Sequence, residues 1–152
     1  MLSIAEDEFV PENLLFIDWS ALKTTDGTTT YLIAGSAYGY LEGIDTNANF
    51  KMITSLVQSP SSHVILTDYY NRCLRSVDCT TNQTSPYSGN CTNKGDQDDV
   101  DALFEDPYSM IIDLKYFKQL ILSELRSGSL KTINLMSKHV KTIRRENTYS
   151  MQ

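Results

Sequence analysis

An internal repeat at a separation of 56 residues constrains the fold of this chain more than any other feature. The segment VILTD at 64–68 aligns with LILSE at 120–124, and the match continues without a gap to Asp78 and Asn134. In each copy, two runs of β-forming residues flank a short elbow, YYNR in the first and LRSG in the second. This pattern predicts strand, turn and strand in both copies.

The two copies extend on both sides of this core. Upstream, the first copy reads G-x-x-E-G-x-x-x-x-A-x-F and ends at Phe50, while a shorter counterpart ends at Phe104. Downstream, TSPYSG at 84–89 resembles TYLIAG at 30–35, and VKTI at 140–143 is a third segment of this kind. Four short strands per unit, with a period near 55 residues, are typical of a β-propeller blade. A blade cannot bury both faces of its sheet alone, so the chain repeats and stacks it, and we expect both phenylalanines to pack between adjacent blades.

These residues resemble the NHL repeat, which occurs in six-bladed β-propellers. The first copy supplies the family's pattern with Gly39, Glu42, Gly43, Ala48, Phe50, Thr67, Asp68, Asn71, Leu74 and Arg75, and the second with Phe104, Pro107, Ser123, Glu124, Leu130 and Lys131. The run NRCLRSVD, followed by TSPYSGNC and DPYSMIID, is most similar to extracellular invertebrate members. The resemblance covers residues 30–145, with departures at Asp99, Ile53 and Gly128.

The expected fold is therefore all-β: an NHL-type β-propeller segment with two blades and strands of a third, a partial or incomplete six-bladed ring. We expect an acidic N-terminal extension at 1–13 and strands of a preceding blade at 14–35. NHL repeat 1 is expected at 30–89, NHL repeat 2 at 84–145 and a C-terminal tail at 146–152. Such a chain exposes an open blade face and open strand edges, which invite pairing. We therefore expect self-association or a partner that completes the propeller.

Composition and short motifs point to an extracellular protein. The chain has 13 basic and 19 acidic side chains and a net charge of -6, which disfavours phosphate backbones and hence nucleic acid. No apolar run approaches the roughly 18 residues of a membrane span, and the N-terminus lacks the apolar core of a signal peptide. Asn82 and Asn90 both begin N-glycosylation tripeptides near clustered cysteines. We expect a secreted fragment of a longer protein, with Asn82 better occupied because it lies at a turn tip.

The three cysteines allow one predicted disulfide. If Arg72–Asp78 and Thr84–Gly89 form an antiparallel hairpin, a turn centred near Thr81 and Asn82 places Cys73 opposite Asn90, one residue from Cys91. A small irregularity at Gly89 then allows a Cys73–Cys91 bridge, whereas Cys79 is too far along the ladder and stays free or cross-links to a partner chain. The alternative is three reduced cysteines in a cytosolic propeller.

The side chains that could carry chemistry favour a protein without catalysis. Acidic residues cluster at Asp96, Asp98, Asp99 and Asp101, but this loop lacks the glycine and closing glutamate of an EF-hand, so we expect a solvated loop, and no cofactor, rather than a calcium site. His63 and His139 are the only histidines, which is too few for the metal centre of an amidating-lyase-like or lactonase-like propeller enzyme.

Tyrosines are the best candidates for partner contacts. Tyr38, Tyr40, Tyr69 and Tyr70 lie in or beside predicted loops, and aromatic residues are frequent at binding hot spots. Tyrosine is also a common strand residue, so the alternative, which we expect for most of the tyrosines, is structural packing. The expected function is an extracellular interaction scaffold that binds a protein or a glycan. The alternatives are a fragment of a metal-dependent propeller enzyme and a cytosolic NHL module that binds RNA or protein.

Overall fold

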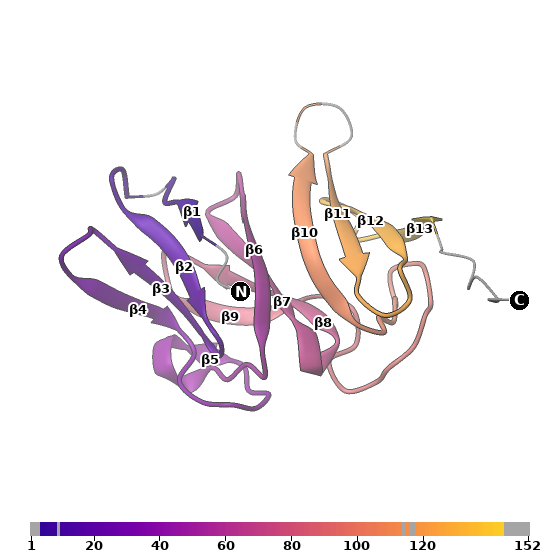
Figure 1. Ribbon diagram of the computed structural model, residues 1–152, viewed down its shortest axis with the longest axis horizontal. Coiled ribbons are helices and arrows are strands. Elements are labelled where there is room, and N and C mark those ends of the chain that lie inside the picture. The colour runs from indigo at the N-terminus through magenta and orange to yellow at the C-terminus, as the bar shows by residue number, and fades with distance from the viewer. Residues whose placement is uncertain (1–3, 9, 114, 116–117, 145–152) are drawn as a thin grey trace, which may run out of the picture.

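The computed structural model describes residues 4–8, 10–113, 115 and 118–144, and these residues form three antiparallel sheets that stand side by side (Figure 1). We call them blades 1, 2 and 3. Blade 1 contains four strands in chain order: β1 (Ile4–Glu6), β2 (Leu14–Asp18), β3 (Ala21–Thr25) and β4 (Thr30–Ala34). No helix among the described residues is long and apolar enough to cross a membrane.

Blades 2 and 3 repeat this arrangement. Blade 2 runs from β6 (Ile53–Ser59) through β7 (His63–Asp68) and β8 (Cys73–Asp78) to β9 (Gln83–Ser88), with the short β5 (Gly43–Ile44) added beside β9. The 3-10 turns η1 (Asp45–Asn47) and η2 (Tyr69–Asn71) precede β6 and β8. Blade 3 contains β10 (Pro107–Asp113), β11 (Gln119–Glu124), β12 (Leu130–Asn134) and β13 (Val140–Arg144). The all-β propeller fold predicted from the repeat is thus confirmed.

The start of blade 1 differs from the predicted division. Ile4–Glu6 forms β1 and pairs with β2, within the segment 1–13 that was expected to be an extension. Three residues are too few to show an alternating pattern, which explains why this strand was not predicted. The three segments that resemble one another in sequence, at 30–35, 84–89 and 140–143, contain β4, β9 and most of β13, each the fourth consecutive strand of its blade.

Two separate cores fill the junctions between the blades. The first joins blade 1 to blade 2 around Phe50, and the second joins blade 2 to blade 3 around Phe104; both rings are fully buried. Each ring packs on a glycine with positive φ, Gly35 (φ 94°) under Phe50 and Gly89 (φ 84°) under Phe104. A Cβ at Gly89 would lie 2.5 Å from the Phe104 ring, so only glycine allows this packing.

A buried ion pair fixes the centre of blade 2. Arg75 is fully buried, with Nη1 3.4 Å from Asp68 Oδ2, and Nη2 donates to the carbonyl oxygen of Leu41 at 3.0 Å. Asp68 accepts hydrogen bonds from the backbone N–H of Lys51 and from Asn71 Nδ2. Burial raises the pKa of Asp68, and these hydrogen bonds oppose that rise. Removing one partner would leave a buried charge and cost several kcal/mol, on the order of 3–5.

The predicted disulfide is present. Cys73 at the start of β8 is bonded to Cys91, just beyond β9, with the two Cα atoms 4.9 Å apart. Val77 faces Thr84 in the β8–β9 hairpin, whereas the predicted register would place Cys79 opposite Thr84. The observed register therefore differs from the predicted one by two residues. The turn closes earlier since the Asp78 carboxylate accepts the backbone N–H groups of Thr80 and Thr81. A register shift after Leu74 then brings Cys91 back to Cys73, and Cys79 stays unpaired.

Candidate interaction face

The turns that follow the second strand of each blade carry exposed apolar side chains. Trp19 follows β2 and is 70% exposed, Tyr70 follows β7 and is 48% exposed, and Leu125 follows β11 and is 55% exposed. In Figure 1, β2 and β11 both run downward into these turns. We call Trp19, Tyr69, Tyr70, Tyr108 and Leu125 the apolar rim.

Contacts between neighbouring blades make the rim continuous. The backbone N–H of Ile53 donates to the Trp19 carbonyl oxygen at 2.7 Å, and the adjacent Met52 accepts from Tyr69 N–H at 2.8 Å. The Tyr69 ring then meets the Tyr108 ring edge to face, with centroids 5.8 Å apart. These contacts link the turns of blades 1 and 2 to the first strand of blade 3.

At the blade 3 end of the apolar rim, Leu125 is held by a backbone hydrogen bond to Asp106. The backbone N–H of Leu125 donates to the Asp106 carbonyl oxygen at 3.0 Å. The buried carboxylate of Asp106 lies 3.8 Å from the exposed Arg126 guanidinium. A cation therefore borders the apolar surface at blade 3.

Tyr70 is held in place rather than free on its turn. Its ring packs on Tyr69 with centroids 4.8 Å apart, and Tyr69 is only 6% exposed. Asn71 in the same 3-10 turn donates to Asp68 Oδ2 at 2.7 Å and to the Gly39 carbonyl oxygen at 3.0 Å. Tyr69 and Asn71 thus hold the turn, so that little conformational freedom is left to the exposed Tyr70.

The four predicted tyrosines have different environments. Tyr70 is exposed and Tyr69 is buried beneath it, as described. Tyr38 is 68% exposed on the connection between blades 1 and 2. The Tyr40 ring lies 4.7 Å from the Arg75 guanidinium and its hydroxyl donates to Glu42, so much of its surface is committed to the fold. Burial also raises the pKa of Tyr40. Two of the four, Tyr38 and Tyr70, therefore present extensive surface.

The acidic loop of blade 3 contacts the side chains of Lys131 and His139. Lys131 Nζ, fully buried, lies 2.7 Å from Asp96 and 3.2 Å from Asp98. Asp99 is 3.1 Å from the imidazole of His139, and the Asp101 carbonyl oxygen accepts from a glutamine side chain. Among the residues that the structure describes, no three metal-binding side chains converge.

The two predicted glycosylation sites lie beyond opposite ends of β9. Asn82 has a left-handed backbone (φ 56°) at the β8–β9 turn and donates to Asp45 at 2.7 Å, whereas Asn90 is exposed beyond β9. Asn90 Oδ1 accepts from the backbone N–H of Thr92 at 3.0 Å. The predicted preference for Asn82 stays a prediction, to be decided by glycopeptide mass spectrometry.

Sequence reasoning did not single out Trp19 or Leu125. A signal exists: each directly follows an acidic residue, Asp18 or Glu124, as Tyr69 follows Asp68. The β2–β3 turn is shorter than the others, so a gapless alignment misses this correspondence.

Comparisons with known proteins identify similar folds but no family for this chain. No family model and no curated protein sequence match the chain. A solved Bacteroides thetaiotaomicron protein of unknown function is similar over 92% of this chain and 34% of its own, with 20% identity and a TM-score of 0.70. A chain of a nidogen–laminin complex is similar over 94% of this chain and 45% of its own, with 16% identity and a TM-score of 0.60.

A third similar structure is the extracellular domain of a hybrid two-component system from B. thetaiotaomicron, with 15% identity and a TM-score of 0.62; the match covers 92% of this chain and 18% of that one. The chain thus spans less than half of each of these three chains. At these identities the likeness establishes the propeller fold alone, and membership of the NHL family stays a prediction.

Proposed function

We propose that this chain is a non-catalytic, extracellular interaction module of the NHL type that binds a protein through the apolar rim. The observation that carries the proposal is that the turn after the second strand exposes an apolar side chain in each of three successive blades: Trp19, Tyr70 and Leu125. Exposed apolar side chains that lie together on one face are typical of protein-binding surfaces. Tryptophan and tyrosine are also the residues most enriched at binding hot spots.

The composition of the rim favours a protein over a glycan. Leu125 is aliphatic and Arg126 beside it is exposed, and this combination with aromatic anchors is characteristic of protein interfaces. The net charge of -6 disfavours RNA as the partner.

Other features support the extracellular location and the absence of catalysis. The Cys73–Cys91 disulfide is of the kind that persists in oxidising compartments. His63 contacts the Ser61 carbonyl oxygen and His139 contacts Asp99, so the two histidines do not share a site. One solved neighbour comes from a complex with a partner protein and another is an extracellular domain.

The test uses Trp19, the only tryptophan in the chain. Extracellular proteins of the source organism are passed over the immobilised chain, and each retained protein is then titrated while Trp19 emission is recorded. We expect a saturable shift to shorter wavelength, and a loss of about tenfold or more in affinity for Tyr70→Ala.

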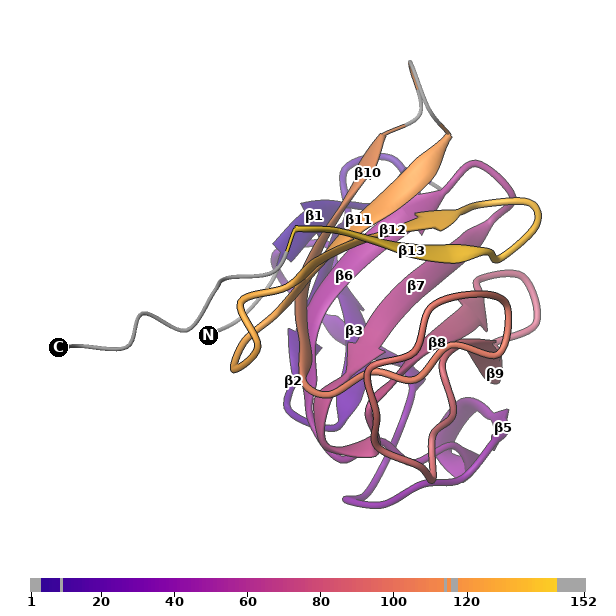
Figure 2. The ribbon, with the colours of Figure 1, turned by 90° about the vertical axis from the view of Figure 1, so that its right-hand side faces the viewer.

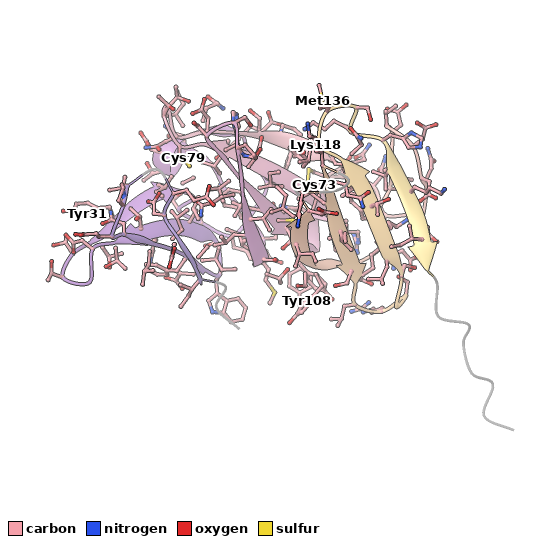
Figure 3. All side chains as sticks on the ribbon, turned by 90° about the horizontal axis from the view of Figure 1, so that it is seen from above. Tyr31, Cys73, Cys79, Tyr108, Lys118 and Met136 are labelled. Carbon is pink, nitrogen blue, oxygen red and sulfur yellow. A yellow bond between two sulfur atoms is a disulfide. The ribbon has the colours of Figure 1, made fainter. Side chains whose placement is uncertain are left out.

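The matched control is Tyr31→Ala, which removes an equally exposed tyrosine from β4, at the far end of the molecule from Tyr108 (Figure 3). A partner that binds both variants equally well would refute the proposed face. Binding only to glycans, without any protein, would also refute it.

A further inference from the structure

We propose that a groove between blades 2 and 3 binds a small organic acid: one carboxylate joined to an apolar body, as in phenylbutyrate. The groove is bounded by the turn after the first strand of blade 2 and the turn after the third strand of blade 3. The apolar rim follows the second strands, so the groove opens at the opposite edge of these antiparallel sheets. The proposal therefore does not depend on the partner of the rim.

Two adjoining hollows form the groove, and they share Ser59, Ser61 and Leu135 in their walls. The hollow that contains Lys138 has a volume of about 320 Å³, and the one beside Met136 a volume of about 450 Å³. In Figure 2 the β12–β13 turn lies beside the β6–β7 turn, and these two turns supply the shared wall. Small-molecule sites in proteins measure about 300–1,000 Å³, so each hollow is large enough for part of such a ligand.

Lys138 gives the first hollow a positive charge without an acidic partner. Its Nζ donates to the Leu135 carbonyl oxygen at 2.9 Å and lies 3.5 Å from the centre of the Tyr87 ring. Within the described part of the chain, no carboxylate lies at ion-pair distance from this Nζ. Burial lowers the pKa of the half-buried Lys138, and a bound carboxylate would oppose that effect.

The lining of the groove has the opposite charge to the chain as a whole. The described residues that line the two hollows include Lys118, Lys138 and His63 but no aspartate or glutamate, although the net charge of the chain is -6. Asp78 faces His63 across β7 and β8, but its carboxylate accepts backbone N–H groups of its own turn. The groove therefore favours an anion, and one half-buried lysine balances the single charge of a carboxylate.

The second hollow supplies the apolar contacts. It is bordered by Pro60, Leu135 and Met136, and Leu135 also packs on the second core. Met136 is 87% exposed and lies near Lys118, away from Tyr108 (Figure 3). Methionine adapts its shape to irregular surfaces, so it can cover a ligand of this kind. A ligand whose carboxylate meets Lys138 would place its apolar body over Leu135 and Met136.

The turn that carries Lys138 does not itself require a lysine. Lys138 has a left-handed backbone (φ 61°), and its N–H donates to the Asn134 carbonyl oxygen at 3.0 Å. Asn82 in the corresponding turn of blade 2 has φ 56°, and its N–H donates to the Asp78 carbonyl oxygen at 2.7 Å. Asparagine adopts this backbone more readily than lysine. The charge is thus an addition at this junction, and Lys138→Asn should keep the turn intact.

Tyr87 is also particular to this junction. In the aligned segments TYLIAG and TSPYSG, Tyr87 corresponds to Ile33. Ile33 and Cys79 pack on the first core, where Tyr87 and Leu135 pack on the second. The junction of blades 1 and 2 therefore has neither the aromatic ring nor the lysine, and the proposed site belongs to blades 2 and 3 alone.

The test is a titration of the isotope-labelled 152-residue chain with phenylbutyrate, followed by heteronuclear NMR. We expect saturable binding, with shifts concentrated at the backbone amides of the groove, among them Ser61, Tyr87 and Leu135. Phenylbutanol replaces the carboxylate with a neutral alcohol, and acetate lacks the apolar body. Each of these two probes should bind at least about tenfold more weakly, because each loses one half of the interaction.

A matched pair of variants locates the charge that binds the carboxylate. Lys138→Asn should weaken phenylbutyrate binding about tenfold and leave phenylbutanol binding unchanged. The control Lys141→Gln removes the same charge from an exposed position on β13 and should bind like the unchanged chain. Circular dichroism verifies that both variants are folded.

Four results would each overturn the proposal. They are the absence of saturable phenylbutyrate binding, shifts that lie outside the groove, equal affinity of the unchanged chain for phenylbutyrate and phenylbutanol, and full binding by Lys138→Asn. Acetate that binds as tightly as phenylbutyrate would also overturn it, since the apolar hollow would then contribute nothing. The comparison of the three probes uses the unchanged chain, so it decides the question even if a variant is unfolded.

Discussion

Replacing Gly89 with alanine tests how tightly the blades pack on each other. Gly89 has φ 84° and its added Cβ would lie 2.5 Å from the Phe104 ring. Gly27 has nearly the same backbone (φ 88°) in the β3–β4 turn, but nothing lies within 4 Å of its Cβ position. Gly27→Ala therefore measures the backbone strain alone, about 1–2 kcal/mol. Gly89→Ala adds overpacking of about 1–3 kcal/mol and should lose about 2–5 kcal/mol in total.

Urea unfolding followed by far-ultraviolet circular dichroism provides the free energies of unfolding. The steric part is checked with Phe104→Leu, because a smaller side chain should relieve the clash in the Gly89→Ala background and produce a favourable coupling energy. An equal loss for Gly27→Ala and Gly89→Ala would refute the packing described here, as would strict additivity with Phe104→Leu.

Three further predictions concern the disulfide and two ionisable groups. Replacing Cys73 and Cys91 together with serine should cost about 3 kcal/mol in unfolding free energy, the loop entropy for the 18-residue separation, and unchanged stability in the same urea assay would contradict this. Burial raises the pKa of the Cys79 thiol to about 11 from 9.0, so its alkylation near neutral pH should be about a hundredfold slower in the folded chain than in urea. That thiol favours the folded state below pH 9 and loses its contribution as the pH rises through about 11. Burial raises the pKa of Asp98, but hydrogen bonds, above all from Thr142, outweigh it and leave the pKa below 3.8. The ionised Asp98 stabilises the folded chain above the ordinary aspartate pKa, and this contribution is lost as the pH falls through the lower pKa of the folded state. Asp98→Asn should therefore make the unfolding free energy fall less steeply with pH on the acid side. An acid-side slope equal to that of the unchanged chain would count against this.

The repeat explains why much of the fold could be predicted from the sequence. Leu66 and Leu122, or Arg75 and Lys131, occupy equivalent strand positions because the two elbows have the same length, so a gapless alignment finds them. Blade 1 escaped full recognition because its turn at Trp19 is shorter, which removes the constant offset.

The candidate face was only partly predictable. Tyr70 was identified as a loop aromatic, but whether Tyr69 or Tyr70 faces solvent depends on the local 3-10 turn, which the residue types do not determine. The role of Lys131 in binding the acidic loop was also not predicted, because Asp96 lies 35 residues away and reaches it only through the connection between blades.

The disulfide has a mechanical consequence for a chain pulled at its ends. It ties β8 to the segment just after β9, so the last hairpin of blade 2 lies inside a covalent loop of 18 residues. Tension that unravels blade 3 from the C-terminal side travels along the connection to Cys91 and passes through the bridge to Cys73. The enclosed strand β9 bears no load, and about 60 Å of chain, at 3.3–3.6 Å per residue, cannot be drawn out. Reduction would release this hidden length, which makes the extensibility of blade 2 dependent on the redox state of its surroundings.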